Sequence, residues 1–216
     1  MQEKIIHNVL ERKLIAIVRG GDPSKITDLG KALLAGGINM IEVTFDQRSS
    51  DGFKATTDSI RTLCEQFAGE VLVGAGTVLS TEQVDLARAA GAGYIITPST
   101  DCDVIRYAKS LGLVVMPGAM TPSEIFDAYR AGADFVKVFP AGDLGPGYIK
   151  AVSAPLSHIP LLAVGGINEK NVKDFLAVGV KGFGVGGNLV NKAWIREGRW
   201  DLITGLAAEF VKNVQM

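Results

Sequence analysis

A lysine stands inside an apolar segment that is typical of a buried strand. Lys137 lies in DFVKVFP, between Val136 and Val138. Burying an ammonium group away from water is costly, and burial lowers the pKa of lysine toward that of a neutral amine. Because a neutral amine can attack a carbonyl carbon, Lys137 is a candidate nucleophile for covalent catalysis. The alternatives are a structural ion pair and a lysine that reaches out to the rim of the fold.

A glutamate occupies the same kind of position earlier in the chain. Glu42 lies in MIEVTF and shares a strand face with Met40 and Thr44. A carboxylate in a buried strand needs a partner, and Lys137 is the obvious candidate. Beside an amine nucleophile, Glu42 could transfer protons. The alternative is that Glu42 only balances the charge of Lys137.

Several residues near predicted strand ends are suited to binding anions. Arg19 ends the first apolar run, in IAIVRG, and a guanidinium can hold a carboxylate or phosphate through two hydrogen bonds. The pairs Gly165-Gly166 and Gly186-Gly187 follow two late apolar runs, where backbone N–H groups can approach a phosphate. The alternatives are an arginine exposed at the rim and glycines that only form tight turns.

Three further residues are predicted to line the pocket. Thr77 follows Gly74-Ala75-Gly76 and could hydrogen-bond a substrate carboxylate or keto oxygen, or else cap the next helix. Pro98, in the turn Thr97-Pro98-Ser99, is expected to close one wall. Phe139, on the same strand face as Lys137, is expected to contact substrate.

A recurring unit indicates how these residues are positioned. A helical stretch ends at a glycine and an apolar, strand-length run follows, as in AGGINMIEVT and AGAGYIIT. Continuously apolar runs are typical of parallel strands buried on both faces. We therefore predict one domain, residues 1–216, forming a (β/α)₈ barrel, with an open doubly wound sheet as the alternative. The predicted strands are 14–18, 39–44, 71–76, 94–97, 113–116, 135–139, 161–164 and 182–186; the terminal helices are 2–12 and 200–214.

Local signals support the helices and loops between the strands. Ser80 with Gln83, and Thr121 with Glu124, each have the spacing of a capping box. The Gly-Pro-Gly of 145–147 is expected to form a loop entering the sixth helix.

Composition excludes several classes of function. The net charge is -1, so no basic excess attracts nucleic acid or an anionic membrane. Cys64 and Cys102 fall in predicted helices, which indicates reduced thiols and a cytoplasmic protein. The N-terminus lacks the apolar core of a signal peptide, and no apolar run is long enough to span a bilayer. The only histidines, His7 and His158, are predicted to lie away from the barrel mouth. Without metal-ligand spacing or a GxGxxG motif, no metal or other cofactor, NAD included, is expected.

Together these segments resemble the family of 2-keto-3-deoxy-6-phosphogluconate aldolase, also called 4-hydroxy-2-oxoglutarate aldolase. The resemblance covers Ile15 to about Val190 and includes AGGINMIEVTF, VGAGTVL, the TPS turn, MPGAMTPSEI, KVFPA and both glycine pairs. It implies a class I aldolase in which Lys137 forms the Schiff base and Glu42 transfers protons. It also implies that Thr77 holds the pyruvate part, that the glycine pairs contact phosphate, and that the enzyme is a cytosolic homotrimer.

Two departures from the family pattern concern substrate binding. Many members place an arginine two residues after the E-V-T threonine, but this chain has Asp46 there and Arg48 slightly later. Arg19 is therefore the favoured carboxylate ligand, with Arg48 or backbone groups as alternatives. Many members also read P-T-G-G before the phosphate loop, where this chain has Ala163-Val164 and lacks the hydroxyl.

The expected reaction is cleavage of 2-keto-3-deoxy-6-phosphogluconate to pyruvate and glyceraldehyde 3-phosphate, or of 4-hydroxy-2-oxoglutarate to pyruvate and glyoxylate. The expected partners are thus a small, phosphorylated 2-keto acid and pyruvate. The alternatives are the galactonate-derived substrate, a phosphosugar isomerase or epimerase using acid and base groups alone, and a non-catalytic phosphometabolite-binding protein.

Overall fold

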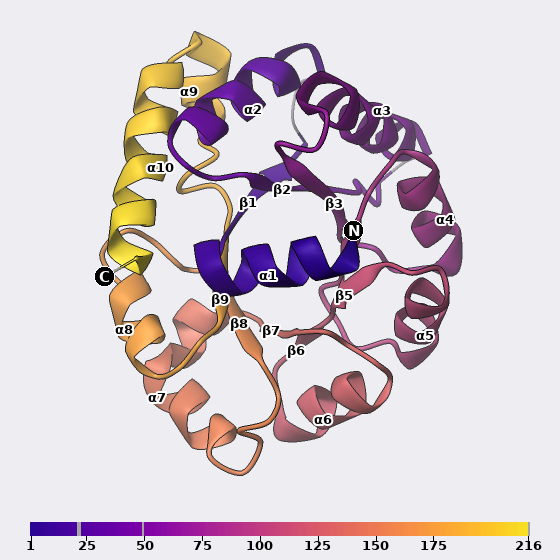
Figure 1. Cartoon of the computed structure of the whole chain (residues 1–216), viewed down its shortest axis with the longest axis vertical. Helices are drawn as coiled ribbons and strands as arrows, with labels where there is room; N and C mark the ends of the chain where they lie inside the picture. The colour runs from indigo at the N-terminus through magenta and orange to yellow at the C-terminus, as the bar shows by residue number, and fades with distance from the viewer. Residues whose placement is uncertain (21–22, 49, 216) are drawn as a thin grey trace.

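The sheet of this protein is parallel throughout and curls into a barrel (Figure 1). The computed structural model describes residues 1–20, 23–48 and 50–215. Within them, nine strands follow the order β5-β4-β3-β2-β1-β9-β8-β7-β6. Their bounds are β1 (Leu14–Arg19), β2 (Met40–Thr44), β3 (Leu72–Gly76), β4 (Tyr94–Ile96), β5 (Val114–Met116), β6 (Gly118–Ala119), β7 (Val136–Val138), β8 (Leu161–Val164) and β9 (Gly182–Val185).

The barrel closes where one predicted strand divides into two. The predicted strand 113–116 corresponds to β5, and β6 continues it beyond Pro117, which has no N–H to donate to a ladder. Across the seam, Asp134 N donates to the carbonyl of Val115 at 3.0 Å and Lys137 N to that of Pro117 at 2.8 Å. Because β5 and β6 together occupy one strand position in the barrel wall, the nine strands fill eight positions. The predicted (β/α)₈ barrel is therefore confirmed over the open sheet.

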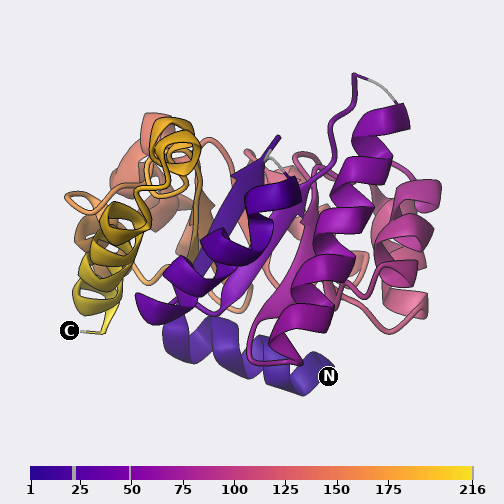
Figure 2. The ribbon, with the colours of Figure 1, turned by 90° about the horizontal axis from the view of Figure 1, so that it is seen from above.

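Helices surround the strands, as the amphipathic stretches between the apolar runs predict (Figure 1). The helix α1 lies beneath the barrel instead (Figure 2), where Ile5 and Val9 pack into its floor. The helices are α1 (Gln2–Arg12), α2 (Ile26–Ala35), α3 (Ser50–Phe67), α4 (Thr81–Ala89), α5 (Cys102–Ser110), α6 (Pro122–Arg130), α7 (Ala141–Ser153), α8 (Val172–Ala177), α9 (Lys192–Glu197) and α10 (Trp200–Val214), with a 3₁₀ turn η1 (Pro23–Lys25).

Inside the barrel, apolar side chains give way to polar ones along the strands. Ile15, Met40, Leu72 and Phe135 pack with the α1 residues in one buried cluster near the strand starts. Two residues further along β2 and β7, the same inward faces carry a glutamate and a lysine. The apolar floor therefore leaves the carboxyl ends of the strands as the end where polar chemistry can occur.

The loop predicted at 145–147 is shorter than expected. One helical turn of α7 precedes it, and Gly145 breaks the helix with φ 78° and ψ 162° before the chain resumes helical geometry at Pro146. A positive φ there favours glycine, and proline suits the first turn of the second segment.

The structure also places the cysteines and histidines. Cys64 on α3 and Cys102 on α5 are free, half-buried thiols, as predicted. His7 lies on α1, at the end of the barrel opposite the mouth, and His158 packs edge-on against Tyr129. Across the described ranges, no helix is long and apolar enough to cross a membrane.

Candidate active site

The two predicted catalytic groups lie inside the barrel. Lys137 is 5% exposed on β7 and Glu42 is 2% exposed on β2. The Nζ of Lys137 lies 5.0 Å from the centre of the Phe139 ring, which places an aromatic face beside the amine. The structure therefore brings Phe139 to Lys137, as the strand alternation predicted.

Burial shifts the pKa of both groups toward the neutral forms. Desolvation raises the pKa of Glu42, opposed by the charges of Lys137 and Arg19. Desolvation lowers the pKa of Lys137, opposed by Glu42 and reinforced by Arg19. The predicted direction for Lys137 is confirmed. A lysine with a lowered pKa supplies more of the neutral amine near neutral pH.

The predicted contact between Glu42 and Lys137 takes a different form. No ion pair within 4.0 Å joins them, and Oε2 of Glu42 has no hydrogen-bond partner among the described side chains and backbone groups. Their interaction is electrostatic across the barrel interior. The unpartnered carboxylate oxygen is thus available to a substrate hydroxyl or a water molecule.

Glycines on β3 make room for the polar interior. A Cβ on Gly76 would lie 1.7 Å from Oε1 of Glu42, so this carboxylate can lie across β3 only because residue 76 is glycine. A Cβ on Gly74 would lie 2.2 Å from the ring of Tyr94, whose buried hydroxyl has no partner among the described residues. Sequence reasoning missed Tyr94; the signal was a Gly-Ala-Gly alternation on an inward strand face.

The predicted anion-binding residues meet around one cavity. A cavity of about 290 Å³ at the ends of β1, β8 and β9 is lined by Arg19, Val164, both glycine pairs, Asn168 and Asn188. The two asparagines were not predicted. Lys137 and Glu42 do not line this cavity. Arg19 relates the two regions, because it faces the cavity while its charge acts on both buried groups.

The two glycine pairs differ in whether the fold itself requires glycine at their positions. Gly165 and Gly166 have φ of 87° and 73°, and a Cβ on either would crowd Phe139 or Gly142 at 3.0 and 2.9 Å. Backbone conformation alone therefore requires the first pair. Gly187 lacks that constraint, since a Cβ there would meet nothing within 4 Å. Packing within the protein therefore does not require glycine at position 187.

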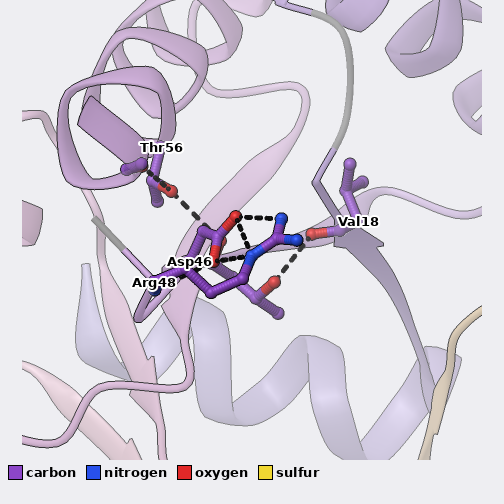
Figure 3. A network of polar contacts seen from close by, with 6 residues as sticks. Val18, Asp46, Arg48 and Thr56 are labelled. Carbon is purple, nitrogen blue, oxygen red and sulfur yellow. Dashed lines mark hydrogen bonds and ion pairs between the residues drawn. The ribbon is translucent and has the colours of Figure 1, made fainter. Parts of the chain in front are cut away.

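Arg48, the arginine nearest to the position where many family members carry one, is paired with Asp46. The guanidinium of Arg48 turns back on Asp46 (Figure 3), with Nε donating to Oδ1 at 2.9 Å. Hydrogen bonding to Arg48 lowers the pKa of Asp46 to about 2. Arg48 is therefore engaged within its own loop, whereas Arg19 lines the cavity.

Thr77 follows β3 in an unusual backbone conformation. Its φ is 54°, a region that β-branched residues rarely adopt. Ser80, not Thr77, caps α4, by accepting a hydrogen bond from Gln83 N. The alternative role of Thr77 as a helix cap is therefore wrong. Its hydroxyl has no partner among the described residues.

The two predicted capping boxes have different outcomes. Thr121 and Glu124 form the complete box. The Gln83 side chain instead accepts from Leu79 N at 2.6 Å and donates to Gln47 at 2.9 Å. The box predicted at Ser80 is therefore only half formed, because Oε1 of Gln83 accepts from Leu79 N and not from Ser80 N.

The turn containing Pro98 packs beside the strand of the lysine. Gly118 of β6 is in register with Lys137, and a Cβ on Gly118 would lie 2.5 Å from the carbonyl of Pro98. Gly118 N also donates to the hydroxyl of Thr97 at 3.3 Å. Pro98 thus lies next to the strand that carries Lys137.

Comparisons with known proteins agree with this arrangement. The family model "KDPG and KHG aldolase" matches residues 5–206. The chain is 40% identical over 181 residues to a probable 2-dehydro-3-deoxy-6-phosphogalactonate aldolase of Rhizobium meliloti, covering 83% of this chain and 82% of that one. It is 32% identical over 215 residues to a 2-dehydro-3-deoxy-phosphogluconate aldolase of Haemophilus influenzae, covering 99% and 98%.

A solved structure resembles the whole barrel. A KDPG aldolase of Legionella pneumophila, solved with pyruvate as a covalent carbinolamine intermediate, matches this chain with a TM-score of 0.84 at 28% identity, covering 96% of this chain and 97% of that one. The barrel, its polar interior and these matches lead to one conclusion: this chain belongs to the KDPG and KHG aldolase family and is a carbon–carbon lyase.

Proposed function

We propose that this aldolase works through a Schiff base on Lys137 and cleaves a 6-phosphorylated 2-keto-3-deoxy sugar acid to pyruvate and glyceraldehyde 3-phosphate. The observation that carries the proposal is the buried amine of Lys137 sharing the barrel interior with the buried carboxylate of Glu42. The covalent carbinolamine formed with pyruvate by the Legionella pneumophila relative supports the same chemistry here.

The steps follow from the two groups. The neutral amine of Lys137 attacks the C2 ketone, and loss of water gives an iminium. Glu42 removes the proton of the C4 hydroxyl, directly or through a water molecule. The C3–C4 bond breaks, its electrons move into the iminium to form an enamine, and the aldehyde leaves. Protonation at C3 and hydrolysis release pyruvate and restore the amine.

Three groups of residues hold the substrate in this proposal. Arg19 binds the carboxylate, and the Thr77 hydroxyl contacts the pyruvate part. Pro98 and Phe139 form walls beside the amine. The backbone of Gly165, Gly166, Gly186 and Gly187 binds the phosphate in the cavity beyond Arg19.

Borohydride trapping tests the covalent step. The protein is incubated with pyruvate and sodium borohydride, digested, and analysed by mass spectrometry. A reduced pyruvate adduct on Lys137 is expected. An unmodified Lys137 would exclude the Schiff base and favour an isomerase or epimerase that uses acid and base groups alone. A protein that binds phosphometabolites without turnover would show a thermal shift and release no pyruvate.

The galactonate-derived epimer is the second candidate substrate. The R. meliloti relative, named for that substrate, is 40% identical, whereas the H. influenzae relative, named for the gluconate-derived one, is 32% identical. As for the phosphate, Val164 gives the cavity an apolar wall where many family members carry a hydroxyl. The two sugar acids differ at C4, so pyruvate release from each, and from 4-hydroxy-2-oxoglutarate, ranks them. A higher kcat/KM for the short substrate would exclude a phosphate preference.

We also propose a cytoplasmic homotrimer. Met120, Phe126 and Tyr129, on or beside α6, are large apolar side chains with substantial exposure, which neighbouring copies would cover. The free thiols of Cys64 and Cys102 suit a reducing compartment. Light scattering after size exclusion tests the assembly, and a monomeric mass would contradict it. Cell fractionation tests the location.

A further inference from the structure

Two glutamine side chains connect the loops that follow β2 and β3. Nε2 of Gln83 donates to Oε1 of Gln47 at 2.9 Å, and Nε2 of Gln47 donates to the carbonyl of Thr77 at 2.7 Å. At its other end, Oε1 of Gln83 accepts from Leu79 N at 2.6 Å. The two amides therefore hold the segment 77–79 at both of its ends.

These hydrogen bonds, from Gln83 through Gln47 to the carbonyl of Thr77, form a relay that begins at a buried side chain and ends at a rare backbone conformation. Gln83, on α4, is 2% exposed and uses both ends of its amide. Thr77 has φ 54°, which a β-branched residue adopts only when its surroundings hold it there. The residues on either side are also fixed, since Phe45 N donates to Gly76 O at 2.8 Å and Val78 N to Ile96 O at 3.3 Å.

The polar groups of Thr77 divide between the protein and the pocket. Its carbonyl accepts from Gln47, whereas its hydroxyl has no partner among residues 1–20, 23–48 and 50–215. An amide accepts at one end and donates at the other, whereas an ionised carboxylate only accepts, so glutamates could not make these contacts. The protein therefore binds the backbone carbonyl of Thr77 and leaves its hydroxyl available to a substrate.

We propose that Gln47 and Gln83 are positioning residues, which hold Thr77 in its left-handed conformation so that its hydroxyl meets the pyruvate part of the substrate. This inference rests on the proposed function, because it takes Thr77 as a substrate ligand. It assigns the two glutamines to substrate binding and not to the covalent step. A change in either should therefore weaken binding more than turnover.

The test compares Gln47→Ala with Gln47→Glu, both at an exposed position. Alanine removes the donor to Thr77, and glutamate keeps the acceptor for Gln83 but cannot donate. Both variants are expected to raise KM for the 2-keto acid about tenfold, the size of one lost hydrogen bond, with kcat changed less than about twofold. The matched control is Gln66→Ala, an exposed glutamine on α3, which should leave both constants unchanged.

A double-mutant cycle separates positioning from a general loss of structure. In a Thr77→Ala background, which lacks the hydroxyl, Gln47→Ala should raise KM no further. Unchanged KM in Gln47→Ala, or an additive effect in the cycle, would overturn the inference. Borohydride trapping of wild type and Gln47→Ala keeps the two proposals distinguishable. If both proteins form the adduct and KM is unchanged in Gln47→Ala, only the positioning role is refuted. If the wild type forms no adduct, the proposed function is refuted.

Discussion

The mouth of the barrel is built differently on its two sides. After β2 and β3, side chains hold one another: Arg48 is paired with Asp46, and Gln47 reaches Thr77. After β8 and β9, glycine pairs leave backbone exposed around a cavity. The first side depends on which functional group each residue carries, and the second depends on the absence of a Cβ. Substitutions on the two sides should therefore fail in different ways.

The interior between these sides opposes folding. Since the folded pKa of Glu42 is raised, its contribution to stability falls as pH rises from the ordinary glutamate value through the folded pKa. Since the folded pKa of Lys137 is lowered, its contribution falls as pH drops from the ordinary lysine value through the folded pKa. Burial of either group in its charged form therefore lowers the stability of the fold. This cost is consistent with the proposed catalytic roles of the two groups.

The largest effect is expected in the interior between the two sides, at Lys137. Lys137→Met keeps an unbranched side chain but removes the amine, so kcat should fall roughly 10⁴-fold or more for phosphorylated and short substrates alike. Pyruvate release measures it. Lys150→Met, at an exposed lysine of α7, is the matched control and should keep full activity. Substantial turnover by Lys137→Met would refute a covalent role for this lysine.

The next effect concerns proton transfer and its dependence on pH. Glu42→Gln should lower kcat about 10²- to 10⁴-fold, the range for a lost general acid or base. In wild type, kcat/KM should rise with pH through a limb set by Glu42, above the ordinary value because burial raises its pKa.

Glu42→Gln should lose the acid limb of the kcat/KM profile that Glu42 sets in the wild type. Since the charge of Glu42 raises the pKa of Lys137, the remaining lysine limb should also move to lower pH. A pH profile of kcat/KM for the two proteins shows both changes. An acid limb that persists unmoved in Glu42→Gln would assign it to another group.

A smaller effect is expected on the glycine side. Gly187→Ala places a methyl group where no protein atom lies within 4 Å, so the fold should tolerate it. If phosphate approaches this backbone, KM for the phosphorylated substrate should rise about tenfold while that for 4-hydroxy-2-oxoglutarate stays constant. Gly205→Ala on α10, equally open, is the control. Equal changes for both substrates would remove Gly187 from the phosphate site.

The smallest effect tests the interior beneath the site. Tyr94→Phe removes a buried hydroxyl without a partner among the described residues, so the free energy of unfolding should rise by about 1 kcal/mol. Denaturant titration measures it. Tyr107→Phe, whose hydroxyl donates to Asp85 at 2.9 Å, should not stabilise the protein. A destabilised Tyr94→Phe would mean that a bound water or another group satisfies this hydroxyl.

The arrangement of the main elements could be predicted from local patterns. The apolar runs at 14–18 and 182–186 correspond to β1 and β9 within one residue at each end. Lys137 and Glu42 stood out because ionisable residues rarely occur in such runs. Their burial is as predicted, whereas the shared cavity of Arg19 and both glycine pairs is seen only in the structure.

Contacts between strands and loops were decided only by the tertiary structure. The carboxylate of Glu42 lies over Gly76, Arg48 turns back on Asp46, and Nε2 of Gln83 donates to Gln47. Each choice depends on what stands opposite in three dimensions. Periodicity along the chain shows which face a residue takes, because that depends on its own backbone. The partner it finds there depends on the packing of segments distant in sequence.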